Sequence, residues 1–278
     1  MTGLPLSGDP LLIAGVCVFL SVAMMVAWLA QKVTGNGGWV DVIWTFITGG
    51  AGVAFALLPP DGEITQRGWL IAALAALWSL RLGVHLARRS ASQEDARYAW
   101  FRKEWGKDFH KRMFVFLQVQ AVAAAILGAA MWLAARNPAP GLGVMDYAGV
   151  AVFLIALWGE STADAQLDAF KADPANKGKV CDRGLWAWSR HPNYFFEWLV
   201  WLGFALCAVN LAGDWPWGWL AFLAPLFMLY LLTRKSGLPP LEDHMARSRP
   251  EAWADYKART SVFFPLPPKA PPRKRVVR

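Results

Sequence analysis

Charged residues are scarce in this chain: Asp, Glu, Lys and Arg make up 17% of its 278 residues, whereas apolar residues make up 56%. A soluble domain usually carries about a quarter charged residues. The apolar residues stand in long blocks, and about 18 mostly apolar residues are enough to span a bilayer. The low charge therefore argues against a soluble domain and predicts an all-α, polytopic membrane bundle.

The sequence also lacks the patterns of common metal and nucleotide sites. Its three cysteines and four histidines show no zinc-binding spacing, so we predict no metal. It contains no Gly-x-Gly-x-x-Gly motif, which excludes a Rossmann site. The net charge of +8 is explained by basic residues that gather in the connections assigned to the cytoplasmic side of the membrane. No nucleic-acid partner is therefore predicted.

About seven apolar blocks are long enough to be spans. We place them at residues 10–31, 39–58, 68–87, 113–135, 143–165, 194–211 and 215–233. The sequence predicts one integral membrane domain over residues 1–268, followed by a basic, disordered tail over residues 269–278.

The basic residues indicate how these spans are oriented. Lys and Arg gather on the cytoplasmic side of membrane proteins. Segment 88–112 has eight of them, segment 166–193 has five, and the chain from Arg234 onward has eleven. The connections assigned to the outside have only Arg67 and Arg136. Seven crossings, with the N-terminus outside and the C-terminus in the cytoplasm, bring every basic segment to one side.

Ionisable residues within the early spans are candidate catalytic groups. Such residues usually face the interior of a bundle and mark a ligand or ion path. Asp41 lies near the start of the second span between two tryptophans, and Arg81 lies on the third span. An ion pair between Arg81 and Glu160 is the structural alternative. We predict Asp41 as the catalytic acid, with Arg81 or Tyr98 as its companion.

A second group of polar residues stands where the sixth span begins, in the stretch GLWAWSRHPNYFFEW (184–198). Pro192 is suited to the first turn of a helix, whose free N–H groups attract anions. Arg190 and His191 add donors beside it, and Asn193 and Glu197 share one face. This arrangement predicts a phosphate or carboxylate site. Anchoring of the helix end to lipid head groups is the alternative.

The segment after the last span is predicted to return to the protein. A polar helix from near Pro250 follows Gly237, Pro239 and Pro240. It could cap a cytoplasmic cavity, and Arg234, Lys235, Glu242, Tyr256 and Arg259 are the candidates to line such a cavity. A helix lying on the bilayer surface is the alternative.

The motif Gly-Leu-Trp-x-x-x-Arg-His-Pro-Asn-Tyr-Phe-x-Glu (184–197) resembles the steroid 5-alpha-reductase-like superfamily, and its bacterial branch most closely. Ser-Arg-Pro-x-x-x-x-x-Tyr (248–256) and Arg-Thr-Ser-x-Phe-x-Pro (259–265) also resemble that branch. Two departures stand out. Phe196 occupies a position where the family often has Gly, and the Gln-Glu pair and Tyr of the steroid reductases have no evident counterpart.

The resemblance implies seven spans and an NADPH bound on the cytoplasmic side by residues 144–265, with the early spans binding the substrate. Together with the analysis of the C-terminal segment, it implies the following cofactor-binding residues: Asp164, Lys171, Arg190, His191, Asn193, Tyr194, Glu197, Glu242, Tyr256 and Arg259.

Two enzyme classes follow from these motifs. The first is an NADPH-dependent reductase of the bacterial inner membrane that acts on a lipophilic enone or steroid-like substrate entering from the bilayer. In it Asp41, if protonated, would donate a hydrogen bond to the developing enolate. The alternative is an S-adenosylmethionine-dependent methyltransferase, because the isoprenylcysteine and phospholipid methyltransferases carry a similar Arg-His-Pro-x-Tyr-x-Gly motif. A lipid-binding or transport protein without catalysis is a third possibility.

Overall fold

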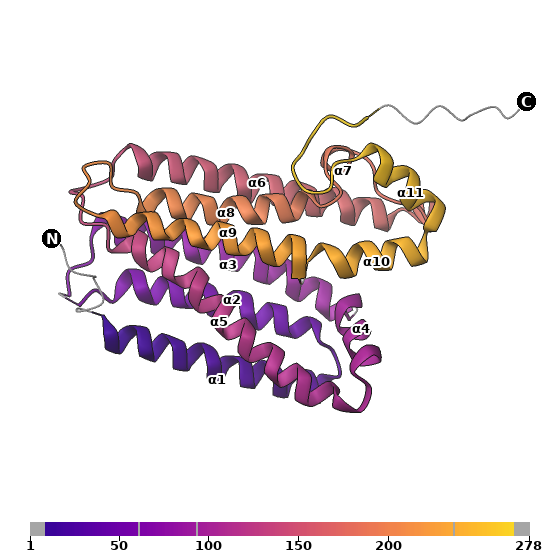
Figure 1. Cartoon of the computed structure of the whole chain (residues 1–278), viewed down its shortest axis with the longest axis horizontal. Coiled ribbons are helices and arrows are strands. Elements are labelled where there is room, and N and C mark those ends of the chain that lie inside the picture. Colours follow the sequence, from indigo (N-terminus) through magenta and orange to yellow (C-terminus); the bar gives the residue numbers. More distant parts are fainter. Residues whose placement is uncertain (1–8, 61, 93, 236, 270–278) are drawn as a thin grey trace, which may run out of the picture. The chain divides into compact units, whose positions relative to one another are not determined.

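The computed structural model of this chain describes residues 9–60, 62–92, 94–235 and 237–269, and within them it is helical without named strands. The α-helices are α1 (Pro10–Thr34), α2 (Gly38–Leu57), α3 (Gln66–Ser92), α4 (Ala96–Trp105), α5 (Phe109–Ala135), α6 (Val144–Ala172), α7 (Leu185–Trp188), α8 (Pro192–Ala208), α9 (Leu223–Tyr230), α10 (Leu238–Ser248) and α11 (Pro250–Arg259) (Figure 1).

The prediction of an all-α, polytopic membrane bundle is confirmed. Among the described residues, 6 helical runs are long and apolar enough to cross a bilayer, which indicates an integral membrane protein. The predicted sixth span forms α8, whose 17 residues are shorter than these runs. The last predicted span belongs to a longer helical run, Pro216–Ser248. The orientation of the two ends stays a prediction.

The chain divides into two compact units. Unit 1 consists of the residues up to Ala151 together with Trp201–Pro225, and unit 2 consists of Val152–Val200 with the residues from Leu226 onward. The prediction of a single membrane domain is not tested by this division. Of the predicted tail, only Lys269 lies within the described residues, and its backbone N–H donates to the carbonyl of Arg259.

In unit 1, α1, α2 and α5 pack against one another, and α3 packs against α2 (Figure 1). The buried side chains Leu20, Met24 and Ala27 of α1 recur every three or four residues and form one inward stripe. Val18 and Val22, on other faces of the same helix, are exposed. A helix with apolar residues both inside and outside is expected where the outer surface meets lipid.

Two arginine–aspartate pairs hold one end of unit 1 together. The guanidinium of Arg67 donates to both carboxylate oxygens of Asp146, each at 2.8 Å, and both side chains are buried. Arg136 donates to Asp9 over 2.7 Å. These arginines are the two that were assigned to the outer connections. Their charges are therefore neutralised within the protein, which fits their presence on the side poor in basic residues.

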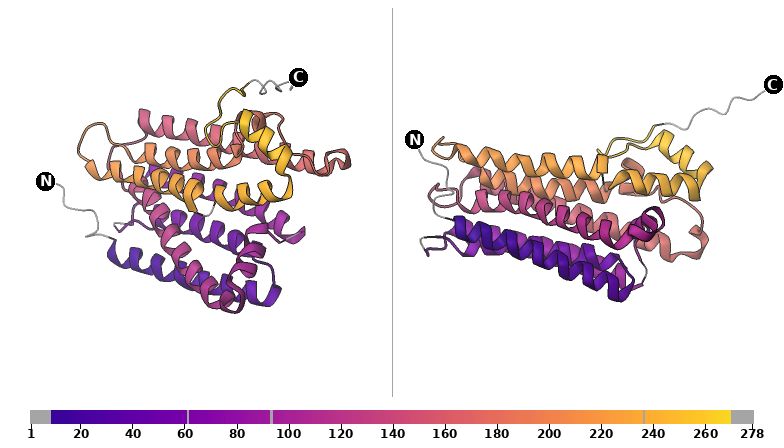
Figure 2. Two further views of the ribbon diagram at one scale, coloured as in Figure 1. Left: turned by 45° about the vertical axis from the view of Figure 1, so that its right-hand side comes forward. Right: turned by 60° about the horizontal axis from the view of Figure 1, so that its bottom comes forward.

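In unit 2, the C-terminal segment returns to the loop before α8, and the predicted helix from Pro250 is confirmed as α11, beside α10 (Figure 2). Ser189 and Ser261 form a parallel bridge, and the Ser189 hydroxyl donates to the Phe263 carbonyl over 2.8 Å. The Leu266 N–H donates to the Trp188 carbonyl over 3.0 Å. The segment after the last span is therefore an ordered part of unit 2.

The departure from the family pattern at Phe196 is accommodated by a glycine on α6. A Cβ atom added to Gly159 would collide with the Phe196 ring. Because only glycine leaves room for the ring, α8 can approach α6 closely at this level. Phe196 thus packs between the two helices of unit 2 that carry the motif and the predicted acidic residue.

Candidate functional site

In unit 1 the structure brings together two of the three predicted catalytic residues. The phenolic hydroxyl of Tyr98 donates to Oδ1 of Asp41 over 2.8 Å. Tyr98 is buried, and its ring packs against Gly37, where an added Cβ would collide with it. The Asp41 side chain remains 19% exposed. The pair can therefore be approached from the carboxylate side.

Arg97 and Asp95 complete this cluster, and neither was among the predicted site residues. Arg97 Nη2 donates to Oδ2 of Asp41 over 2.6 Å, and Arg97 Nε donates to Asp95 over 3.0 Å. Asp95 is the N-cap of α4 and accepts the backbone N–H of Arg97 over 2.9 Å. Burial raises the pKa of Asp95, but the charges of Arg97 and Arg89 and the hydrogen bonds from Arg97 lower it well below its usual value.

Arg81, the third predicted catalytic residue, is not part of the cluster. It lies partly buried on α3, and it is absent from the hydrogen bonds and ion pairs that Asp41 and Tyr98 make within the described residues. Among the predicted companions, Tyr98 is therefore the one that bonds Asp41.

In unit 2 the motif at the start of α8 contacts α6. Asn193 Nδ2 donates to Oδ1 of Asp164 over 3.3 Å. The His191 ring stacks on Tyr194, with centroids 5.7 Å apart. Pro192 is the first residue of α8, as predicted. Asp164, His191, Asn193 and Tyr194 thus lie at one helix end, where the resemblance placed part of the cofactor site.

Arg190 is engaged by the protein itself. Its Nε donates to Glu242 over 2.9 Å, its Nη2 lies 2.8 Å from the same oxygen, and its Nη1 donates to the Thr260 carbonyl over 2.9 Å. The Arg190 side chain is 7% exposed. These bonds tie α10 and the end of α11 to the motif. Arg190 therefore positions the site, and a direct phosphate contact would require breaking them.

Glu242 also faces His191, whose Nε2 lies 3.2 Å from the carboxylate. Burial lowers the pKa of His191, and the neighbouring Glu242 only partly opposes this effect. His191 is therefore neutral near pH 7. In that form Nε2–H can donate to Glu242 while Nδ1 remains an acceptor.

The remaining predicted cofactor residues occupy different surroundings. The Tyr256 hydroxyl donates to the Trp186 carbonyl over 2.6 Å, so this buried side chain supports α7. Arg259 pairs with Asp182 and Asp255 at 3.3 and 2.8 Å. Lys171 is exposed near the end of α6, and Glu197 is buried on α8. The structure therefore joins Glu242 and Tyr256 to the motif, Tyr256 through the Trp186 carbonyl, whereas Arg259 pairs with two aspartates outside the motif.

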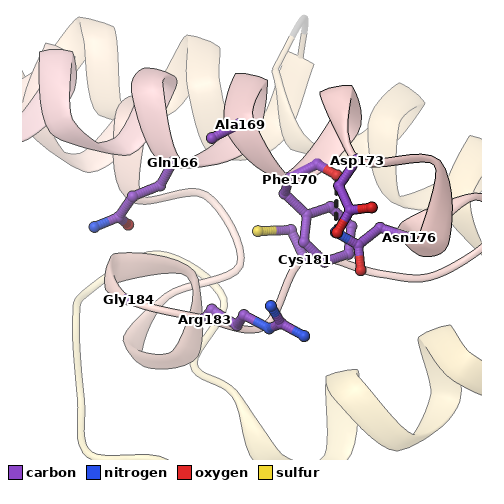
Figure 3. A pocket seen from close by; sticks show the side chains of 8 residues that line it. All are labelled: Gln166, Ala169, Phe170, Asp173, Asn176, Cys181, Arg183 and Gly184. Carbon is purple, nitrogen blue, oxygen red and sulfur yellow. Dashed lines mark hydrogen bonds between the residues drawn. The ribbon is translucent and has the colours of Figure 1, made fainter.

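Unit 2 also contains an open cavity of about 320 Å³ between the end of α6 and the segment that leads to α7. Figure 3 shows Gln166 and Phe170 of α6 on one side, Arg183 and Gly184 on the other, and the thiol of Cys181 between them. Gly184 is the first residue of the motif. Burial raises the pKa of Cys181, so the thiol is a poor nucleophile.

These features define a helical integral membrane protein with an Asp41–Tyr98 pair in one unit and an Arg-His-Pro-Asn-Tyr motif in the other. The chain belongs to the family described as "Protein of unknown function (DUF1295)", which matches residues 27–260 and lies in the steroid 5-alpha-reductase-like group.

A curated relative is similar over much of its length. "Uncharacterized protein C594.04c" of Schizosaccharomyces pombe is 25% identical over 267 residues, which cover 86% of this chain and 76% of the relative. No solved structure matches the chain.

Proposed function

We propose that this protein is an NADPH-dependent membrane reductase acting on the activated C=C bond of a lipophilic enone or steroid-like substrate. The observation that carries the proposal is the arrangement of unit 2. The Asn193–Asp164 bond and the His191–Tyr194 stack stand at the end of a motif whose first residue, Gly184, lines an open cavity. Membership of the steroid 5-alpha-reductase-like group supports the same class.

The residues present fit a dinucleotide. Asp164, which accepts from Asn193, is a carboxylate, and a carboxylate can accept from a ribose hydroxyl or a carboxamide. The partly exposed ring of Tyr194 offers a stacking surface. When bound, a reduced nicotinamide supplies hydride, and the protein contributes orientation and exclusion of water. Arg190, Glu242 and Thr260 hold α10 and the C-terminal segment in place around these groups.

In unit 1, Tyr98 is better suited than Asp41 to donate a proton to the substrate. Both oxygens of Asp41 accept hydrogen bonds, one from Tyr98 and one from Arg97. Asp41 therefore orients the phenol, which can turn its proton toward a substrate carbonyl. Addition of hydride to the β-carbon of an enone develops negative charge on that oxygen, and a donor placed there stabilises it.

The proposal also includes the setting of the reaction. We infer a bacterial inner membrane protein, with the basic segments and the cofactor residues on the cytoplasmic side. The substrate enters from the bilayer, in keeping with the 6 apolar helical runs. Membrane lipids are the other partners that this setting implies.

Cofactor binding tests the proposal most directly. Purified protein in detergent is heated with NADPH, with NADH or with S-adenosylmethionine, and the melting temperature is recorded. A rise with NADPH supports the reductase. A rise with S-adenosylmethionine alone would replace it with the methyltransferase, whose motif shares Arg190, His191, Pro192 and Tyr194 with this chain.

A further inference from the structure

Arg183 is a cation without an anionic partner in a cavity. Within the described part of the chain, its guanidinium forms no ion pair. The guanidinium carbon lies 5.9 Å from the centroid of the Phe170 ring, in a cation–π contact. The neighbouring Asp182 is paired with Arg259 instead. The Arg183 side chain is exposed and lines the cavity without an ion pair.

The other arginines of unit 2 in this region are engaged differently. Arg190 is held by Glu242 and by backbone carbonyls, and Arg259 is held by two aspartates. Asp173 in the cavity wall accepts from the backbone N–H of Ala175 and from Asn176, which orient its carboxylate and leave its negative charge in place. Arg183 is thus the guanidinium in this region that is available to an anion.

The donors in the cavity fit a phosphate group. A guanidinium presents several N–H groups in one plane, which matches the oxygens of a phosphate. The Gln166 carboxamide accepts the backbone N–H of Leu185 through Oε1, so its NH₂ group remains as a second donor. Lys177 and Lys179 are exposed on the same loop and add positive potential.

The position of the cavity beside the first residue of the motif suggests which phosphate group it would bind. Gly184 lines the cavity at the start of the motif, α7 follows, and Asn193 bonds Asp164 beyond it. A ligand that contacts both ends must be elongated. NADPH differs from NADH by one phosphate at the adenosine 2′ position, at the end remote from the nicotinamide.

We propose that Arg183 and Gln166 form a phosphomonoester site that recognises the 2′-phosphate of the cofactor and thereby selects NADPH over NADH. This inference rests on the proposed reductase function for the identity of the ligand. The cavity, its guanidinium and its amide donor are independent of that function.

Two small nucleotides test the site without turnover. The affinities of 2′,5′-ADP and 5′-AMP are measured by calorimetry on the full chain in phosphatidylcholine nanodiscs. Loss of a hydrogen-bonded charged group should weaken 2′,5′-ADP binding about tenfold to a hundredfold in Arg183→Ala. Binding of 5′-AMP should not change. Arg183→Lys should keep part of the affinity, because it retains the charge but not the planar fork.

Arg247→Ala is the matched control, because Arg247 is an exposed arginine of the same unit and lies outside the cavity lining. It should bind both nucleotides as the unaltered protein does. Equal affinity of Arg183→Ala and the unaltered protein for 2′,5′-ADP overturns the assignment. Displacement of 2′,5′-ADP by phosphatidic acid in the nanodisc also overturns it, since the cavity would then be a lipid head-group site.

The two proposals fail in different ways. If NADPH and NADH bind equally well to the unaltered protein, the selectivity proposal falls and the reductase proposal stands. If neither dinucleotide binds but 2′,5′-ADP binds through Arg183, the phosphate site stands and the reductase proposal falls. If none of these molecules binds, both fall.

Discussion

The Tyr98 hydroxyl lies 2.8 Å from Oδ1 of Asp41, and the two residues are 57 positions apart in the chain. The contact depends on the turn between α3 and α4, where Asp95 begins α4 and Arg97 bridges Asp95 and Asp41. The carboxylate holds the phenol in place, and we expect the single Tyr98 proton to turn from Asp41 toward a substrate oxygen when that oxygen binds.

Replacing either residue should abolish the reaction and leave cofactor binding intact. We expect Asp41→Asn and Tyr98→Phe to lose reduction of an enone substrate while NADPH still raises the melting temperature. Tyr98→Phe also removes one hydrogen bond, at about 1 kcal/mol. Tyr147→Phe is the control, because Tyr147 is exposed at the start of α6. Retained turnover in Asp41→Asn would clear Asp41 of a catalytic role.

Only part of the Asp41 cluster could be predicted from the sequence. Asp41 was predicted because a carboxylate at the start of an apolar span is costly. Arg97 and Asp95 were missed, because segment 88–112 contains eight basic residues and their number was explained by orientation alone. Only the three-dimensional structure shows that Arg97, among these basic residues, bonds Asp41.

The same distinction holds for the fold and for unit 2. Long apolar runs predicted the helices, since a chain in lipid must satisfy its backbone hydrogen bonds locally. The family resemblance implied that Asn193 and Asp164 belong to the same cofactor site. It did not predict the role of Arg190, because the pattern of residues cannot show that Glu242 and the Thr260 carbonyl already occupy the guanidinium.

The Asn193–Asp164 contact gives a second prediction. Asn193→Ala should weaken NADPH binding and retain the fold, because one 3.3 Å hydrogen bond is lost and the side chain is partly exposed. Isothermal calorimetry with NADPH measures the change. Asn210→Ala, which breaks a buried contact with Asn137 in unit 1, should lower the melting temperature without altering NADPH affinity. Unchanged affinity in Asn193→Ala would contradict the assigned role.

Substitution of Arg190 or Glu242 should affect the stability of the protein more than its binding of NADPH. Glu242→Ala leaves the Arg190 guanidinium buried without its carboxylate, which should cost about 3 kcal/mol. The melting temperature and the protease sensitivity of α10 and α11 report this loss. Arg190→Lys should also lose stability, because an ammonium cannot reproduce the directed bonds to Glu242 and to the Thr260 carbonyl. A Glu242→Ala protein with full stability would show that Arg190 does not position this segment.

The Arg67–Asp146 ion pair has a structural role in unit 1, and substitutions can measure its contribution to stability. Both side chains are almost fully buried, at 3% and 4% exposure. Arg67→Met alone strands a buried carboxylate and should cost about 3–5 kcal/mol. The double variant Arg67→Met, Asp146→Leu should recover much of that loss, since an apolar pair of similar size carries no desolvation cost. A double variant no more stable than the single one would show that the backbone contacts of Arg67 dominate.

The lowered pKa of His191 should make the stability of unit 2 depend on pH. In the unfolded chain the imidazole has its ordinary pKa of about 6.5, whereas burial lowers the pKa in the folded protein. As pH falls through about 6.5, the unfolded state therefore takes up a proton before the folded state does, and stability decreases. The melting temperature between pH 8 and pH 5 should fall less steeply in His191→Gln, whose amide cannot titrate but can still donate to Glu242. His244→Gln is the control, because His244 is exposed on α10. A His191→Gln protein with an unchanged pH profile would mean that the imidazole is equally protonated in the folded and unfolded states, against the burial that the structure shows.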